Sequence, residues 1–207
     1  MPKKMIRRER RAQILQALHE CLKEKPFHQT SIKDIAKKAG VNHGLLHYYF
    51  ENKEDILLKY IDFTYDKYSA IYTERFNYRL NQAAVTNETF SEICRWTLHE
   101  VSFNSELARI FTEIWSLAIY NPKVMTKLKE HYLKWKDRMS ALIAHFVRDK
   151  QTALRLSLTL IALTEGMSLF SVFFRPSDLC HDIDFLMMMQ SMVSDNEIQI
   201  KPQPDHV

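Results

Sequence analysis

Apolar side chains in the first 25 residues recur at three- and four-residue spacing, which is the period of an amphipathic α-helix. The members of this stripe are Ile14, Leu18, Cys21 and Leu22. Pro26 follows and cannot continue the helix, because its ring removes an N–H donor and clashes with the preceding turn. Similar stripes return along most of the chain, whose 207 residues include only 3 Gly and 6 Pro. The pattern therefore predicts an all-α fold with long helices and few tight turns.

Residues 29–58 (QTSIKDIAKKAGVNHGLLHYYFENKEDILL) carry the signals for two short helices joined by a tight turn. Ser31 and Asp34 have the spacing of a capping box at the start of the first helix. Gly40 stands where a left-handed residue ends a helix. Asn42 is a favourable N-cap for the second helix.

The second of these short helices has two chemically different faces. Its apolar side carries Leu46, Tyr49 and Phe50, and its outward side carries His43, Gly44, His47 and Tyr48. A helix of about eight residues is not stable alone in water, so neighbouring helices must hold it in place. Two short helices of this kind are typical of a helix-turn-helix, whose second helix enters the major groove of DNA.

The segment from Thr30 to Leu58 resembles the signature of TetR-type transcriptional regulators. The residues that carry the resemblance are Thr30, Ser31, Ile35, Ala36, Ala39, Gly40, Val41, Gly44, Leu46, Tyr49, Phe50, Lys53, Glu54 and Leu57. The chain departs from the family pattern at Leu45, where a Thr or Ser is usual, and at His47, where a Tyr is usual. The resemblance implies a transcriptional regulator, with repression as the favoured mode, that binds a near-palindromic operator as a homodimer and is released by a small molecule.

The charge of the chain is uneven. Residues 1–53 hold 12 of the 29 Lys and Arg residues but only 5 of the 25 Asp and Glu residues, whereas the whole chain has a formal net charge of +4. An ordinary solvated basic face would explain this charge if it stood alone. Together with the helix-turn-helix pattern, a basic first quarter followed by an acidic remainder indicates nucleic-acid binding.

Candidate DNA contacts follow from side-chain chemistry. Histidine and tyrosine can donate to guanine acceptors or phosphates, leucine can contact a thymine methyl group, and glycine lets the backbone approach the duplex closely. Hydroxyls, helix N-terminal amides and cations suit phosphates, and a cationic arm (residues 3–11) precedes the first helix. The predicted DNA-binding residues are Thr30, Ser31, Asn42, His43, Gly44, Leu45, His47, Tyr48, Lys53, Arg7 and Arg8.

Downstream of residue 52 the apolar periodicity predicts further helices. Their ranges are 53–79, 88–103, 106–120, 122–149 and 152–174, followed by a helix that contains FLMMMQSMV. We predict three parts: a three-helix helix-turn-helix domain (1–52), a larger helical domain for effector binding and dimerisation (53–193), and a flexible tail (194–207). The long helix after residue 52 would join the DNA-binding helices rigidly to the second domain.

Residues 152–174 and the FLMMMQSMV segment are apolar on more than one face and need cover on several sides. A second copy about a two-fold axis could supply this cover, and the resemblance implies that the last two long helices pair as a four-helix interface. A buried helix within a monomer is the alternative. The predicted interface residues are Leu160, Thr164, Met167, Ser168, Ser171, Met188 and Met192.

Aromatic and methionine side chains of the second domain could line an effector cavity, although such stripes also form plain core. The candidates, polar anchors included, are Phe63, Trp96, His99, Phe111, Glu113, Trp115, Tyr132, Trp135, Met139, Glu165 and Phe170. A pocket of this kind would favour an apolar or aromatic molecule, and an acidic anchor would favour a cation.

No segment reaches the ~20 uninterrupted apolar residues of a membrane span, and the basic start lacks the apolar segment of a signal peptide. The three scattered cysteines, Cys21, Cys94 and Cys180, suit a reducing compartment without disulfides. Cys21 fits the core, and a redox role for the other two stays open. We therefore expect a cytoplasmic protein.

Two alternatives to a ligand-released repressor remain. A DNA-binding protein of the same fold could lack a small-molecule effector and be switched by a protein partner. An α-helical enzyme is disfavoured, because the chain has no phosphate-binding glycine loop, nucleophile elbow or H-E-x-x-H motif. His43 and His47 have the i, i+4 spacing of metal ligands, but no third ligand is near in sequence, so we predict no metal and no other cofactor.

Overall fold

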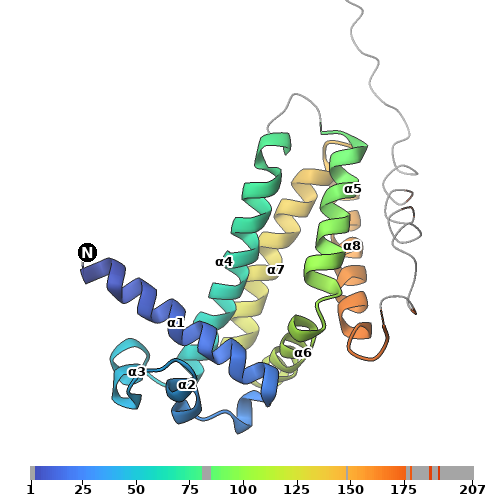
Figure 1. The fold of residues 1–207 in the computed structure, drawn as a ribbon. Coiled ribbons are helices and arrows are strands. Elements are labelled where there is room, and N and C mark those ends of the chain that lie inside the picture. Colours follow the sequence, from blue (N-terminus) through green and yellow to red (C-terminus); the bar gives the residue numbers. More distant parts are fainter. Residues whose placement is uncertain are drawn as a thin grey trace, which may run out of the picture. The chain divides into compact units, whose positions relative to one another are not determined.

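A computed structural model describes residues 3–80, 85–147 and 149–175, together with Asp178, Met187 and Ser191. No strand occurs within these ranges, and the predicted all-α fold is confirmed (Figure 1). The elements are α1 (Lys3–Glu24), η1 (Phe27–Gln29), α2 (Ile32–Lys38), α3 (His43–Tyr49), α4 (Lys53–Leu80), α5 (Asn87–Trp96), η2 (Thr97–Ser102), α6 (Ser105–Tyr120), α7 (Pro122–Ile143) and α8 (Lys150–Phe170). The short element η1 is a 3₁₀-helix, and η2 is a π-helix.

The described residues form two compact units. Unit 1 contains the residues up to Glu74 and Arg109–Tyr132, and unit 2 contains Arg75–Ala108 and the described residues from Leu133 onward. Helices α4, α6 and α7 each contribute residues to both units. The domain boundary predicted between α3 and α4 stays a prediction. The predicted tail (194–207) lies outside the described residues.

Unit 1 has an apolar core to which α1, α2, α3 and α4 contribute together with α6 and α7. Its most deeply buried members include Ile14, Leu18, Ile35, Leu46, Tyr60 and Ile114. Burial of each aliphatic side chain of this kind contributes roughly 1.5–3 kcal/mol. The seven-residue helices α2 and α3 are therefore stabilised by packing on their neighbours rather than by their own propensity.

The caps predicted for α2 and α3 are confirmed. Ser31 Oγ accepts a hydrogen bond from the Asp34 N–H (3.1 Å), and Asp34 Oδ2 accepts one from the Ser31 N–H (2.8 Å), which closes a capping box. Gly40 has a φ of +64°, a left-handed conformation that residues with a side chain rarely adopt. Asn42 Oδ1 accepts a hydrogen bond from the Gly44 N–H at the start of α3 (2.8 Å).

Two segments differ in conformation from the prediction. Residues 3–11, predicted as an arm, are the first part of α1, because Lys, Arg, Met and Glu are all good helix formers. The helix predicted over 88–103 is α-helical only to Trp96 and continues as the π-helix η2. There the Phe103 N–H bonds to the Leu98 carbonyl, five residues earlier, at 2.7 Å.

The boundary between α7 and α8 also differs from the prediction. The helix α7 ends at Ile143 rather than near residue 149, and α8 spans Lys150–Phe170 rather than 152–174. Asp149 is the N-cap of α8, and its Oδ2 accepts a hydrogen bond from the Thr152 N–H at 2.7 Å. Because an N-cap residue has extended backbone, α7 must end before it.

Unit 2 has its own core, in which aromatic rings meet edge to face. The ring centroids of Phe90 and Phe146 are 5.4 Å apart, and those of Phe76 and Trp96 are 6.0 Å apart. Such pairs stabilise beyond the area that they bury.

The two described cysteines are buried in different units. Cys21 is 3% exposed in the core of unit 1, as predicted. Cys94 is 2% exposed, and burial raises the pKa of its thiol to about 12. A thiol that stays protonated and inaccessible is a poor redox sensor. Cys180 lies outside the described residues.

Candidate nucleic-acid interface

The helix α3 packs one face on the core and presents the other to solvent. Leu46 is 1% exposed and Phe50 is 3% exposed, whereas Tyr48 is 68% exposed. The other exposed positions of α3 and its cap are Asn42, His43, Gly44 and His47, and Leu45 and Tyr49 are half-buried. The structure therefore brings the predicted contact residues of this helix together on one accessible face.

His43 and His47 lie one turn apart on this face, with ring centroids 5.1 Å apart in an edge-to-face arrangement. Their exposed ring nitrogens suit the guanine N7 and O6 acceptors of the major groove, or phosphate oxygens. In the part of the chain that the structure describes, no group of three His, Cys, Asp or Glu side chains is placed to hold a metal ion.

The N-terminal part of α1 adds positive charge beside α3. The Arg7 guanidinium carbon lies 5.9 Å from the ring centroid of Tyr48, and Arg7 and Arg8 are both exposed. Further along α1, Gln13 Nε2 donates to the carbonyl of Ala39 at the end of α2 (2.7 Å). Helix α1 thus supports the helix-turn-helix and places cations near its exposed face.

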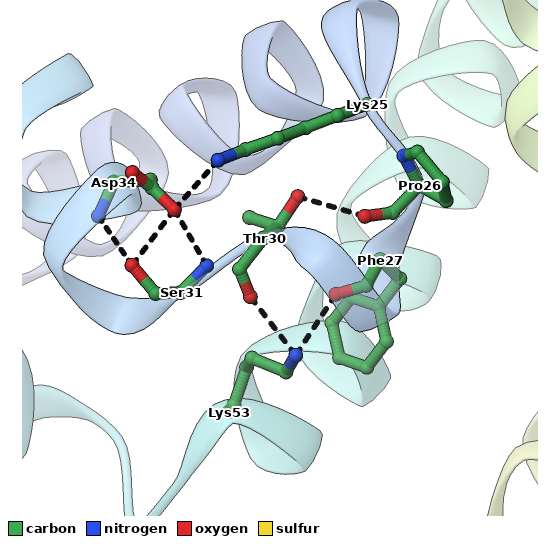
Figure 2. A network of polar contacts seen from close by, with 7 residues as sticks. All are labelled: Lys25, Pro26, Phe27, Thr30, Ser31, Asp34 and Lys53. Carbon is green, nitrogen blue, oxygen red and sulfur yellow. Dashed lines mark hydrogen bonds and ion pairs between the residues drawn. The ribbon is translucent and has the colours of Figure 1, made fainter.

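Thr30 does not reach solvent, in contrast to its predicted role at a phosphate. Its side chain is 1% exposed, and its Oγ1 donates to the Pro26 carbonyl at 3.1 Å (Figure 2). The hydroxyl closes the η1 turn, so it is not available to a phosphate. Ser31 is exposed at the start of α2, where the prediction placed it.

Asp34 links the start of α2 to α1. Its Oδ2 accepts hydrogen bonds from Lys25 Nζ at 2.8 Å and from the Ser31 N–H and hydroxyl at 2.8 and 2.7 Å (Figure 2). The Lys25 hydrogen bond, followed by those from Ser31, holds the pKa of the Asp34 carboxyl far below its usual range. The carboxylate is therefore ionised throughout the neutral range.

Lys53, predicted to contact a phosphate, has internal partners. Its Nζ donates to the carbonyls of Phe27 (2.8 Å) and Thr30 (2.9 Å) and lies 4.3 Å from the ring centroid of Phe27 (Figure 2). Burial lowers the pKa of Lys53, although the charge of Glu113 acts in the opposite direction. An ammonium group has three N–H donors, and two of these point to backbone carbonyls.

Glu113, predicted as an anchor for an effector, also has a structural partner. Its Oε1 accepts a hydrogen bond from the Phe27 N–H at 2.5 Å. Burial raises the pKa of Glu113, and this hydrogen bond partly offsets the effect.

The predicted effector-pocket residues belong to both units. Unit 1 contains Phe63, Phe111, Glu113, Trp115 and Tyr132, and unit 2 contains Trp96, His99, Trp135, Met139, Glu165 and Phe170. Within unit 1, Trp115 Nε1 donates to the Tyr132 hydroxyl at 2.8 Å. Within unit 2, His99 is exposed and Phe170 is 50% exposed, so neither is enclosed as a pocket wall would be.

A polar cluster between α4 and α7 was not predicted. His131 is buried, its Nε2 lies 2.9 Å from Asp62 Oδ1, and its ring stacks on Tyr65 with centroids 4.3 Å apart. Lys127 Nζ lies 3.2 Å from the same Asp62 oxygen. The buried Nδ1 of His131 has no hydrogen-bond partner. Because Asp62 and His131 are far apart in sequence, no local pattern could have paired them.

Several predicted interface residues of α8 are buried within the chain itself. Leu160 is 0% exposed, and the Thr164 and Ser171 hydroxyls donate to carbonyls of their own helical segment at 2.8 and 2.7 Å. These three side chains therefore cannot meet a second copy at the surface. Met167 and Ser168 are half-buried, and Met188 and Met192 lie outside the described residues.

A different set of apolar side chains is exposed on α8 and just after it. This set, the α8 apolar face, is Leu158, Phe170, Val172, Phe173 and Phe174. By length and composition alone α8 could also cross a membrane, but a core helix of a soluble protein meets the same criterion.

Two family profiles match the chain and together cover more than half of it. Residues 14–60 match the profile of bacterial regulatory proteins of the tetR family, and residues 86–179 match the C-terminal profile of BetI-type transcriptional repressors.

Curated relatives match this chain over stretches of different lengths. The fatty acid metabolism regulator protein of Bacillus subtilis is 44% identical over 52 residues, 25% of this chain and 27% of that protein. The regulator BetI of Yersinia pestis is 39% identical over 57 residues, 28% of this chain and 29% of that protein. These matches span under a third of each relative. The BetI regulator of Escherichia coli is 25% identical over 170 residues, 81% of this chain and 84% of that protein.

Solved structures share the fold over most of their length. The regulator FadR from Bacillus subtilis in complex with stearoyl-CoA has a TM-score of 0.66 at 19% identity, covering 91% of this chain and 98% of that one. A transcriptional regulator from Saccharomonospora viridis in complex with choline has a TM-score of 0.72 at 19% identity, and the match covers 91% of this chain and 97% of that one. At such identities the likeness shows the fold alone.

Proposed function

We propose that this chain, which belongs to the TetR family of bacterial transcriptional regulators, is a repressor that binds a near-palindromic operator as a homodimer and is released by a small-molecule effector. The observation that carries this proposal is the exposed face of α3, where polar and aromatic side chains stand on a helix whose other face is buried. A cytoplasmic location follows from this role.

In the proposed complex α3 lies in the major groove. His43, His47 and Tyr48 donate to base edges or phosphates, and Gly44, which has no side chain, allows close approach of the backbone. The half-buried Leu45 would contact a thymine methyl group with its accessible part.

The surroundings of α3 supply affinity that does not depend on sequence. Arg7 and Arg8, exposed on α1, and Ser31, exposed at the start of α2, are placed to reach phosphates. Each phosphate that a cation neutralises makes the affinity more sensitive to salt.

The proposed dimer uses the α8 apolar face. Leu158 and Phe170 are each about half exposed in the single chain (51% and 50%), and an isologous contact would cover the same residues on both copies. Two copies of α3 would then reach half-sites one helical turn apart, ~34 Å.

The proposed effector is a small cation or an apolar molecule. The match to the BetI-type C-terminal profile and the fold shared with a choline-bound regulator support a quaternary ammonium compound. The FadR structure with stearoyl-CoA supports an acyl thioester as the other candidate. Half-buried aromatic side chains such as Trp115 and Tyr132 suit either ligand, since they offer both a π-face and apolar area.

The test is footprinting of the full chain on the DNA upstream of its own gene, repeated with choline and with a long-chain acyl-CoA. We expect protection that one of the two ligands abolishes, together with a ligand-dependent rise in melting temperature. Protection that neither ligand changes, without a thermal shift, would favour a regulator switched by a protein partner. No protected sequence would refute the repressor.

A further inference from the structure

The chain makes a single turn of 3₁₀-helix, η1, between α1 and α2. The N–H groups of Gln29 and Thr30 both bond to the Pro26 carbonyl, at 3.0 and 3.1 Å. Ser31, the N-cap of α2, is the next residue. The position of the η1 turn therefore sets where α2 begins, and α3 follows α2 after one tight turn.

Two other helices hold this turn, chiefly through Phe27. From α6, Glu113 Oε1 accepts a hydrogen bond from the Phe27 N–H at 2.5 Å. From α4, Lys53 Nζ donates to the carbonyls of Phe27 and Thr30 at 2.8 and 2.9 Å, and Figure 2 shows the ammonium group between these two oxygens. Hydrogen bonds between a charged group and the backbone are roughly twice as strong as neutral ones.

The two helices that hold the turn also extend beyond unit 1. Lys53 is the first residue of α4, which continues into unit 2, and α6 begins in unit 2 before it reaches Glu113. Lys53 and Glu113 therefore connect the η1 turn to two helices that each contribute residues to both units, and a displacement of either helix would change these contacts.

We propose that Lys53 and Glu113 are positioning residues for operator recognition, which together fix the η1 turn, and hence α2 and α3, relative to α4 and α6. This inference rests on the proposed repressor function. It replaces the phosphate contact that the sequence predicts for Lys53, since the ammonium group spends two of its three donors on backbone carbonyls.

Because Lys53 and Glu113 carry opposite charges, substitutions of the two residues can distinguish a positioning role from a direct electrostatic effect on DNA. Lys53→Met removes an attraction to DNA phosphates, and Glu113→Leu removes a repulsion, so a purely electrostatic role predicts opposite changes in DNA affinity. Positioning predicts that both substitutions lower affinity for the operator. It also predicts that affinity for unrelated DNA stays constant, because correct orientation matters only for reading bases.

The experiment measures binding of the full chain by fluorescence anisotropy, on the footprinted operator duplex and on an unrelated duplex of equal length. We expect Lys53→Met and Glu113→Leu each to lower the ratio of operator affinity to unrelated-duplex affinity by about tenfold, with an unchanged salt slope. Glu113→Gln, which keeps the acceptor oxygen, should remain near wild type. Lys33→Met, at an exposed lysine of α2, is the matched control and should leave the ratio unchanged.

A double variant adds a second criterion. In the double variant Lys53→Met with Glu113→Leu, the ratio of operator affinity to unrelated-duplex affinity should fall little further than in the more affected single variant, because both residues act on one turn. A destabilised chain would instead lose active protein equally on both duplexes, leaving the ratio unchanged and contradicting the proposal.

Other results would also overturn the inference. A salt slope reduced by about 0.9 in Lys53→Met, with equal losses on both duplexes, would assign the lysine to a phosphate. If Glu113→Leu bound the operator more tightly, the glutamate would act only by repelling DNA phosphates and not by positioning the turn. A wild-type chain that does not distinguish the two duplexes would refute the repressor and this inference together.

Discussion

The helices α3 and α8 each expose side chains that the core does not cover, and the two exposed sets differ in chemistry. α3 exposes His43, His47 and Tyr48, which can donate hydrogen bonds. α8 exposes Leu158 and Phe170, and the apolar face continues over residues 172–174. Duplex DNA is recognised through donors and positive charge, whereas a second protein chain is bound through apolar side chains that leave water. The difference supports the proposal that α3 binds DNA and that the α8 apolar face binds a second copy of the chain.

The two helices also differ in what holds them. The seven-residue α3 depends on a side-chain cap, a left-handed glycine and core packing. The 21-residue α8 is capped by Asp149 but has length enough for many of its own hydrogen bonds. Changes at the caps and buried positions of α3 should therefore act on stability and DNA binding together, whereas changes at exposed apolar residues of α8 should act on association first.

The largest effect should come from a charge on the α8 apolar face. We expect Leu158→Glu to give a monomer by light scattering and to weaken operator binding about 10²- to 10⁴-fold, because the two half-site contacts lose their linkage. Leu133→Glu is the control, at a leucine of α7 that is 45% exposed against 51% for Leu158. Unchanged dimer mass in Leu158→Glu would remove this face from the interface.

At the exposed positions of α3 the expected effect is smaller and is confined to DNA binding. His47→Ala and Tyr48→Ala should each weaken operator binding by about 1–3 kcal/mol without changing the molecular mass, since each removes one contact per half-site. Gel-shift titrations beside light scattering separate the two readouts. Normal operator affinity in both variants would exclude this face as the reader.

Replacement of two glycines, one before α3 and one inside α8, should change the free energy of unfolding in opposite directions. Gly40→Ala should destabilise the chain by roughly 1–2 kcal/mol, because a side chain at a φ of +64° is strained although space around it is open. Gly166→Ala, inside α8 and equally uncrowded, should stabilise by roughly 0.5–1 kcal/mol. Chemical denaturation measures both. If both substitutions changed the free energy of unfolding in the same direction, the left-handed backbone at Gly40 or the helical backbone at Gly166 would be wrong.

The smallest expected effect is on the melting temperature, from substitutions of the two aspartates that accept hydrogen bonds at the starts of α2 and α8. Hydrogen bonds lower the pKa of both carboxyl groups. The main donor to Asp34 is Lys25, and the main donor to Asp149 is the Thr152 hydroxyl. Groups with a lowered folded pKa add stability above the unfolded value, about 3.9 for aspartate, and lose it as the pH falls below that value.

Asp34→Asn and Asp149→Asn should therefore lower the melting temperature at pH 7, and both deficits should shrink in acid. The Asp34 deficit should persist to lower pH, because its pKa is lowered further. Deficits that do not change with pH would show that lost packing, rather than charge, explains them.

Sequence reasoning worked where the controlling interactions are local. The caps at Ser31 and Asn42 and the left-handed Gly40 each depend on residues within a few positions, so the bounds and faces of α2 and α3 could be predicted. The fold class followed from periodicity, which is also a local property.

It failed where a side chain has a partner distant in sequence. The contacts of Lys53 with the Phe27 and Thr30 carbonyls, the contact of Glu113 with Phe27 and the pairing of Asp62 with His131 each depend on tertiary packing. The faces of α8 could not be assigned, because apolar residues occur all around this helix and only its neighbours decide which are covered.

The proposed function requires that α3 of each copy lies in the major groove of one half-site. The most direct measurement is methylation interference on the footprinted operator, since methylation of guanine N7 blocks the major groove and methylation of adenine N3 blocks the minor groove. If two copies of α3 enter the major groove, guanine N7 methylation should interfere in two patches about one helical turn apart. Interference from adenine N3 alone, or from a single patch, would contradict it.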